Sequence, residues 1–147
     1  MKKGINYALT LSFIIFGLFS CEEEKNEIVQ DFDYFGCKSE TKNKINVETI
    51  RFKILNNRQL YVEHFDTYFN CEPGEITVSA KINNTTIEIY EDESDHSADC
   101  ICPYDLEFKI NGIKYGENII SIFLMDSKRA TFNINLNENT DTTILLN

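Results

Sequence analysis

Four cysteines after residue 21 are the side chains with the clearest chemical potential in this chain. Cys100 and Cys102 are separated by one isoleucine, and Cys37 and Cys71 lie earlier. Such a set could bind a metal, act as a reactive dithiol or form structural disulfides. An even number of cysteines in an exported chain predicts disulfides, and the N-terminus, described below, predicts export.

Three pairings of these four cysteines are possible. A bridge between Cys100 and Cys102 would be strained, because side chains two residues apart in a strand share a face but diverge. We therefore expect Cys37 and Cys71 each to join one member of the CxC pair. If the strand runs unbroken upstream of Pro103, both sulfurs of that pair should point to the core. Each bridge would contribute roughly 3 to 4 kcal/mol.

A zinc or copper site is the metal alternative, with His64, Cys71, Cys100 and Cys102 as ligands. The spacing gives it little support, because CxC without a second CxxC or HxxxH is not a standard zinc pattern. A redox dithiol has less support still, since no CxxC motif opens a helix. We therefore predict no cofactor.

The rest of the sequence offers no recognisable catalytic constellation. There are two histidines, and G-x-S-x-G and phosphate-loop motifs are absent. His64 lies in a strand-like stretch, where we expect it to be partly buried or hydrogen-bonded. Its neighbours Glu63 and Asp66 have a spacing that is routine for carboxylates on the wet face of a sheet. His96 lies in the acidic run 91–99, which we expect to be a solvated loop. These patterns favour a non-enzymatic binding or structural role.

The N-terminus predicts export. Lys2 and Lys3 precede an apolar stretch, 7–21, that is too short to span a bilayer, which is typical of a cleaved secretory signal. Its last residues, LFSC, resemble a bacterial lipobox. This resemblance implies cleavage after Ser20 and acylation of Cys21, so that a lipid bilayer becomes the first partner. More than one acyl chain makes such anchoring stable.

The acidic residues directly after Cys21 bear on the cellular location of the protein. Glu22, Glu23 and Glu24 resemble the surface-export signal of Bacteroidota lipoproteins, which implies an outer-membrane protein facing the cell exterior. The alternative is a solvated tether without a targeting role.

Composition narrows the possible partners. Removing residues 1–20 takes away two of 14 basic residues and none of 24 acids, leaving a mature net charge of −12. Such a charge repels phosphate backbones, so nucleic acid is not expected as a partner. A protein or glycan ligand remains open, and a glycan would meet exposed tyrosines such as Tyr61, Tyr68 or Tyr115, although the chain has no tryptophan.

The elements that must position these residues are strands. Residues 1–20 form the predicted signal, 21–36 a flexible lipidated tether without sustained period, and 37–147 one domain in which apolar and polar residues alternate. We expect about eight short strands near 47–55, 59–69, 75–82, 85–91, 104–111, 118–125, 130–136 and 141–146. Their lengths and spacing favour an all-β fold, an antiparallel sandwich first and a barrel second.

Three stretches together resemble small Bacteroidota lipoproteins of unknown function. They are LYVEH (60–64), FNCEPG (69–74) and CICPYDLEFKI (100–110). The resemblance covers roughly residues 37–125 and implies location and fold but no activity. Members of that family often carry a second cysteine directly after the FNC, where this chain has Glu72, and Thr49 marks the position of its partner. The resemblance therefore implies one bridge fewer than in those proteins.

Overall fold

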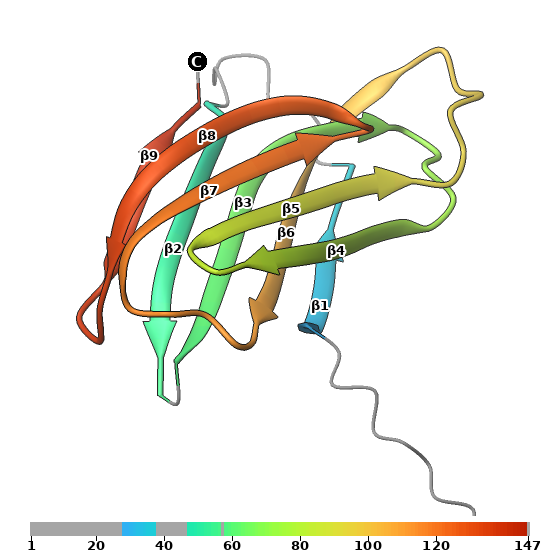
Figure 1. Ribbon diagram of the computed structural model, residues 1–147. Helices are drawn as coiled ribbons and strands as arrows, with labels where there is room; N and C mark the ends of the chain where they lie inside the picture. Colours follow the sequence, from blue (N-terminus) through green and yellow to red (C-terminus); the bar gives the residue numbers. More distant parts are fainter. Residues whose placement is uncertain (1–27, 38–46, 57, 147) are drawn as a thin grey trace, which may run out of the picture.

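The computed structural model describes residues 28–37, 47–56 and 58–146. Over these residues the chain forms nine β-strands and no helix, and the strands make two facing sheets (Figure 1). The predicted signal and Cys21 lie outside the described residues. In the part of the chain that is described, no helix could cross a membrane.

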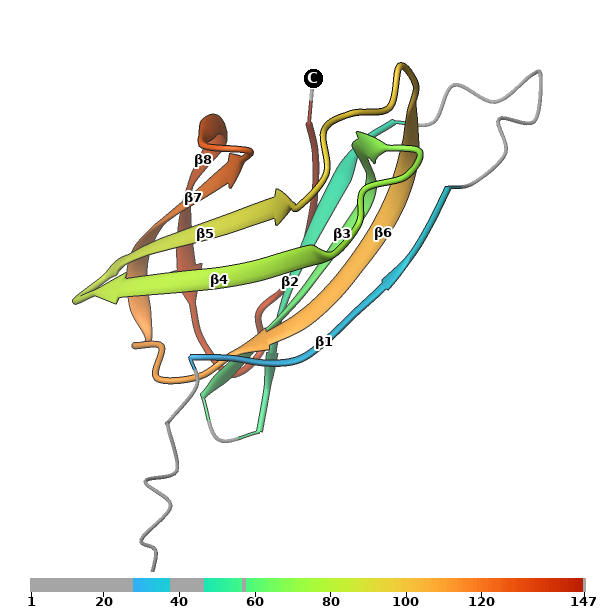
Figure 2. The ribbon, with the colours of Figure 1, turned by 90° about the vertical axis from the view of Figure 1, so that its right-hand side faces the viewer.

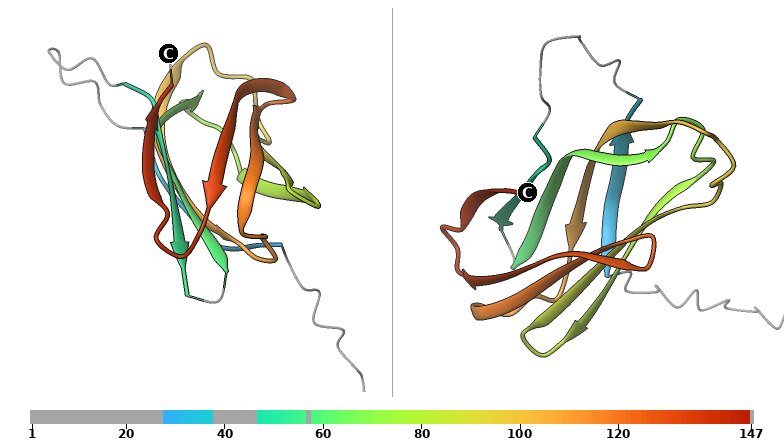
Figure 3. Two further views of the ribbon diagram at one scale, coloured as in Figure 1. Left: turned by 60° about the vertical axis from the view of Figure 1, so that its left-hand side comes forward. Right: turned by 90° about the horizontal axis from the view of Figure 1, so that it is seen from above.

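The two sheets form the layers of a sandwich (Figure 3). The five-stranded sheet has the order β1-β6-β3-β2-β9, built from β1 (Val29–Phe35), β6 (Ile101–Ile110), β3 (Gln59–Asn70), β2 (Thr49–Leu55) and β9 (Asp141–Leu145). The four-stranded sheet has the order β4-β5-β7-β8, built from β4 (Ile76–Asn83), β5 (Thr86–Glu93), β7 (Gly116–Leu124) and β8 (Ser127–Leu136). The predicted disulfide-linked all-β sandwich is confirmed.

One strand pair departs from the expected antiparallel arrangement. The chain leaves the four-stranded sheet after β5, adds β6 to the other sheet and returns as β7, which pairs with β5 in parallel. All other pairs in the described residues are antiparallel. The crossover through the opposite sheet supplies the long connection that a parallel pair needs.

The core lies between the sheets and follows the period of two in the sequence. Even-numbered residues of β2 and β6 face inward, as do the isoleucines of β5. The largest fully buried side chains are Phe52, Phe69, Phe108, Ile50, Leu60, Ile76, Ile87, Ile89, Leu106, Ile110, Ile120 and Ile122. Burying this apolar surface is the main source of the sandwich's stability.

The predicted tether is wrong for residues 29–35, which form β1 at the edge of the five-stranded sheet beside β6. A bulge at Asp31, whose φ is 50°, shifts the register between Gln30 and Asp33. Only Val29 and Phe32 pack against the core. Because the bulge breaks the alternation of an edge strand that buries little, the sequence shows no sustained period there.

The strands define two ends of the sandwich. At the entry end, Val29 at the start of β1 pairs with Ile110, which also pairs with Leu60. At the far end, β3 finishes at Asn70 and β6 begins at Ile101, opposite each other in the register. Figure 2 shows β1 running from the entry end toward the far end, where the connection from β5 to β6 also lies.

Candidate functional site at the far end of the sandwich

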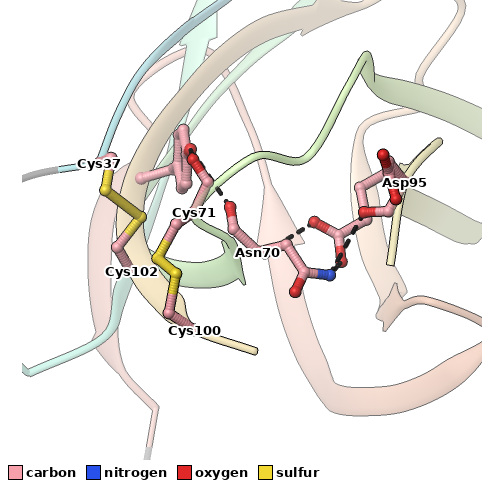
Figure 4. The surroundings of a disulfide bond; sticks show 8 residues. Cys37, Asn70, Cys71, Asp95, Cys100 and Cys102 are labelled. Carbon is pink, nitrogen blue, oxygen red and sulfur yellow. Dashed lines mark hydrogen bonds between the residues drawn. A yellow bond between two sulfur atoms is a disulfide. The ribbon is translucent and has the colours of Figure 1, made fainter. Parts of the chain in front are cut away.

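Two disulfides cross-link the far end. Cys37, just after β1, is bonded to Cys102 in β6, with Cα atoms 5.1 Å apart, and Cys71, just after β3, is bonded to Cys100, with Cα atoms 5.6 Å apart. The expectation that each early cysteine joins one member of the CxC pair is confirmed. Figure 4 shows the two bridges next to each other. Three adjacent segments of the five-stranded sheet are thus fixed at one point.

The expected orientation of the CxC pair is correct for only one of its cysteines. Cys102 is buried with the core, but Cys100 is exposed because it precedes β6, which begins at Ile101. Ile101, between the two bridged cysteines, is 69% exposed. The motif therefore holds an apolar side chain out into solvent on a backbone that is fixed on both sides.

A pocket of about 360 Å³ opens beside this isoleucine. Its floor is the fully buried Phe69. Its walls come from the ends of β3, β5 and β6, the loop after β5 and the β7–β8 turn, and they are Tyr68, Asn70, Glu93, His96, Ile101 and Met125. Apolar walls around a few convergent polar groups are the usual composition of a small-molecule site.

The turn that carries Met125 has an unusual backbone. Met125 and Asp126 form the two-residue loop between β7 and β8, and both have positive φ, 48° and 62°. This is the conformation of type I′ hairpins, in which asparagine and glycine are the common residues. A methionine held there is uncommon, and it places an apolar side chain that is 39% exposed at the pocket mouth.

Glu93 gives the pocket its charge. It is the last residue of β5, and its side chain is 1% exposed. It accepts hydrogen bonds from the backbone N–H of Asn70 at 2.8 Å and from the Asn70 side-chain amide at 2.5 Å. Nδ1 of His96, an imidazole that is 59% exposed, lies 3.1 Å from Oε1 of Glu93. The Asn70 amide also donates to the backbone carbonyl of Asp95 at 3.3 Å (Figure 4).

Tyr104 supports this end of the molecule from the core side. Its ring packs edge-on against Phe69 and its hydroxyl donates to the backbone carbonyl of Asn70 at 3.3 Å. The ring also covers Gly36, where an added Cβ would overlap its carbon atoms. Glycine is therefore required at position 36, where the chain passes close to the Tyr104 ring.

We expect Gly36→Ala to lower the free energy of unfolding by about 1 to 3 kcal/mol, because the new methyl group would displace the Tyr104 ring. Urea denaturation of the purified protein measures this. Ser79→Ala, on the exposed face of β4, is the control and should change stability by less than about 0.5 kcal/mol. Equal midpoints for Gly36→Ala and the wild type would contradict the packing role of Gly36.

A second group of charged residues lies deep between the sheets. His64 of β3 is fully buried, with Nδ1 2.9 Å from Oε2 of Glu91 and Nε2 3.0 Å from Oε1 of Glu48. Arg129 of β8 donates to both carboxylate oxygens of Glu48. Because ionised carboxylates only accept hydrogen bonds, both His64 nitrogens carry protons and the ring is an imidazolium. We call these four residues the buried charge network.

Electrostatics within the buried charge network favour the charged forms. Burial alone would lower the pKa of His64, but the carboxylates of Glu91 and Glu48 raise it to about 9. Burial acts to raise the pKa of Glu48, whereas hydrogen bonds and charges of His64 and Arg129 outweigh it and lower that pKa. His64 has no exposed surface. The network therefore ties the two sheets together and does not form a site that a ligand can reach.

The structure does not bring the metal alternative together. Cys71, Cys100 and Cys102 are all in disulfides, and His64 is occupied by two carboxylates. The sulfurs of Cys37, Cys71 and Cys102 lie within 4.8 Å of one another because the two bridges are adjacent. Sulfurs in disulfides are not the thiolates that zinc or copper requires.

The three tyrosines named for glycan binding do not form one platform. Tyr61 and Tyr68 are seven residues apart on β3, roughly 20 Å along a strand. The Tyr61 hydroxyl donates to Glu107, and burial, followed by this bond, raises the pKa of Tyr61 to about 12. The guanidinium of Arg58 lies over the ring of Tyr115 at 5.3 Å. Of these tyrosines, Tyr68 alone lines the far-end pocket.

Another aromatic pair, on the outer face of the four-stranded sheet, is also closed to stacking ligands. Tyr90 of β5 and Phe123 of β7 stack with ring centroids 4.8 Å apart. Lys81 lies 4.6 Å from the Tyr90 centroid and Lys128 lies 5.3 Å from the Phe123 centroid. These four side chains, one from each strand of the sheet, contact one another in a line across it. Their cross-strand and cation–π contacts stabilise the sheet.

A larger hollow, about 450 Å³, lies between the edge strands β1 and β4. Its polar side chains, such as Gln30, Asp31 and Glu75, are exposed, and it contains no buried charged group among the described residues. We prefer the far-end pocket as the candidate site because it combines apolar walls with a buried carboxylate on cross-linked strands.

Sequence reasoning missed Glu91 and Glu93, which it placed in a solvated loop. Both are buried, because β5 extends to Glu93 and the two residues continue the inward-facing series that begins with Ile87 and Ile89. That alternation was the available signal. His96, by contrast, is exposed as expected.

The described residues thus define a disulfide-linked β-sandwich with one charged, apolar-walled pocket at its far end. No family model, curated protein or solved structure matches the chain.

Proposed function

We propose that this protein is a lipoprotein of the outer membrane, anchored through acylated Cys21 and facing the cell exterior, whose sandwich is a non-enzymatic binding module. The observation that carries the proposal is the position of the pocket. It opens at the far end of the sandwich, whereas the chain from Cys21 joins the sandwich at the entry end.

The length of the connection supports this arrangement. Ile28, the first described residue, lies seven positions after Cys21. Seven residues span at most about 25 Å even when fully extended. An anchor at Cys21 would therefore hold the entry end close to the bilayer and leave the far end to meet ligands.

The disulfides support a binding role for the far end. Asn70 is adjacent to the bridged Cys71, and Ile101 lies between two bridged cysteines. Pocket walls fixed before the ligand arrives lose less conformational entropy on binding, which raises affinity. Extracellular conditions also keep such bridges oxidised.

Membrane anchoring is tested by expressing the full chain in a bacterial envelope with and without Cys21→Ser. We expect the wild type in the membrane fraction with residues 1–20 removed and a mass increase from acyl chains, and the variant without that increase. Intact mass before and after reduction should also show a gain of two hydrogens for each of the two bridges.

Ser20→Ala is the matched control, because it keeps a small residue before the cysteine and should leave acylation unchanged. Protease added to intact cells then reports which side of the outer membrane the sandwich faces. Unacylated wild-type protein in the soluble fraction would overturn the proposal, and protection from added protease would overturn its surface location.

A further inference from the structure

We infer that the far-end pocket binds a small organic cation, an ammonium or guanidinium group on an apolar body, with the charge placed against Glu93. This inference rests on the proposed function of the sandwich as a binding module and adds the class of ligand. It follows from the charge, the access and the walls of the pocket.

The charge of the pocket is not neutralised by a fixed cation. The two hydrogen bonds that Glu93 accepts from Asn70 come from neutral groups. Among the described residues, no lysine or arginine forms an ion pair with Glu93. A buried carboxylate without a cationic partner is unfavourable. A ligand that brings a positive charge would therefore gain more at Glu93 than a neutral one.

The other charged cluster of the core shows the contrast. Glu48, which is similarly buried, contacts both Arg129 and the imidazolium of His64. The cationic partners of Glu48 belong to the protein itself, so the buried charge network needs no ligand. Glu93 has only His96 in a comparable position, and that ring is 59% exposed on the loop after β5.

Access to Glu93 runs past His96. Because the imidazole is exposed and belongs to a loop, it can move aside without disturbing a strand. Its contact with Oε1 at 3.1 Å marks the side of the carboxylate that faces the pocket mouth. The Asn70 side-chain amide donates to this same Oε1, and the Asn70 backbone N–H donates to Oε2.

The walls select the rest of the ligand. Ile101 and Met125 are 69% and 39% exposed, and both line the pocket with Phe69 beneath them. A volume of about 360 Å³ is at the low end for small-molecule sites, which fits one aromatic ring or a short alkyl chain. The mature net charge of −12 attracts cations from solution.

The sequence offers a direct probe of the pocket. The chain has two methionines, Met1 and Met125, and the predicted cleavage after Ser20 removes the first. We propose to label the methionine methyl groups with 13C in the purified protein, reconstituted in zwitterionic lipid nanodiscs. Met125→Leu identifies the Met125 signal, and its shift on titration reports occupancy of the pocket.

Three titrants share one apolar body and differ in charge: phenethylammonium, 2-phenylethanol and phenylacetate. We expect saturable shifts of the Met125 methyl with phenethylammonium and an affinity at least about tenfold weaker for the other two. Nα-acetyl-lysine methylamide, which keeps the side-chain ammonium, is the fourth titrant. It distinguishes a free amine from a lysine side chain as the natural source of the cation. Tighter binding of the capped lysine than of phenethylammonium would favour the lysine source.

Two variants test the assigned role of Glu93. Glu93→Gln keeps the size of the side chain and should abolish the preference for the cation, lowering its affinity about tenfold or more. Glu117→Gln changes net charge equally on an exposed residue of β7 and should leave the affinity within about twofold. Denaturation midpoints show whether either variant is folded.

The outcomes separate this inference from the proposed function. Equal binding of phenethylammonium and 2-phenylethanol, or an unchanged preference in Glu93→Gln, would overturn the cation inference while leaving a binding pocket. No shift of Met125 with any titrant would also overturn it. Failure of the Cys21→Ser experiment would remove the anchored lipoprotein, and the same titrations would then be carried out on the purified protein without nanodiscs.

Discussion

Replacing His64 with alanine is expected to lower the free energy of unfolding by about 3 to 5 kcal/mol. The change removes the imidazolium and leaves Glu91 and Glu48 buried on either side of the gap, with Arg129 as the remaining cation. Breaking a buried ion pair by removing one partner costs this much because the other charge is uncompensated. Urea denaturation at pH 6.5 measures the loss.

The second histidine provides the control for this substitution. His96 is 59% exposed, and its contact with the Glu93 carboxylate is made from a loop. His96→Ala should therefore change the free energy of unfolding by less than about 0.5 kcal/mol. Similar losses for the two variants would contradict the central role of the buried charge network.

The same residue predicts how stability depends on pH. The folded-state pKa of His64 is raised from its usual 6.5 to about 9 by Glu91 and Glu48, against the effect of burial. A raised pKa means that its contribution is complete below pH 6.5 and is lost as the pH rises through about 9. The loss should amount to about 3 kcal/mol. The lowered pKa of Glu48 has the opposite sign, since its contribution is lost as the pH falls below about 4.5.

Denaturation at pH 6.5 and pH 9.5 separates His64 from other titrating groups. The wild type should lose stability between these values, and His64→Ala should be nearly constant over the same interval. If His64→Ala does not accumulate as a folded protein, the wild-type profile still carries the prediction. A wild type equally stable at both pH values would contradict it.

Loss of both disulfides is expected to have the largest effect of all. The Cys71–Cys100 bridge closes a loop with a sequence separation of 29, and the Cys37–Cys102 bridge one of 65. Loop-closure entropy assigns them about 3.5 and about 4 kcal/mol, respectively. Their sum is comparable with the whole stability of many domains, so the protein lacking all four cysteines should be largely unfolded at 37 °C.

Thermal unfolding of paired serine variants measures each bridge. Cys71→Ser with Cys100→Ser should lower the melting temperature somewhat less than Cys37→Ser with Cys102→Ser, because its loop is shorter. Adding reductant to the wild type should reproduce the combined effect. Free thiols together with stoichiometric zinc or copper in the native protein would instead support the metal alternative.

Alternation along the sequence was sufficient to predict the sandwich and most of its strands. Ile50, Phe52 and Ile54, for example, recur every second residue, and all three are buried. The strand that was not predicted, β1, contains a bulge at Asp31 that interrupts the alternation. A second bulge changes which residues face inward. At Asp66, whose φ is 56°, the register between β3 and β6 shifts, and the inward face changes from even to odd residues. Phe69 is consequently buried.

Charged residues on core positions were harder to interpret. Glu48 precedes Ile50 by two, His64 follows Val62 by two and Glu91 follows Ile89 by two, so alternation alone placed all three inside. The polar character of these three side chains, however, predicted positions on the surface. The conflict is resolved only when strands distant in sequence meet and their charges compensate one another, which no single segment reveals.

The pocket could not be predicted because its parts come from five separate segments. The CxC motif indicated a cross-link, but the exposure of Ile101 depends on where β6 begins. The role of Met125 depends on a turn without the usual asparagine or glycine. The pairing of Cys37 with Cys102 was one of the alternatives that sequence spacing left open.

The residue between the two bridged cysteines has a consequence for how this protein can diversify. The side chain of Ile101 faces solvent, whereas its backbone is held by the disulfides of Cys100 and Cys102 on either side. A single codon change at position 101 would thus alter a wall of the far-end pocket and leave the scaffold intact. Such a position is suited to rapid variation under selection and to saturation mutagenesis in the laboratory.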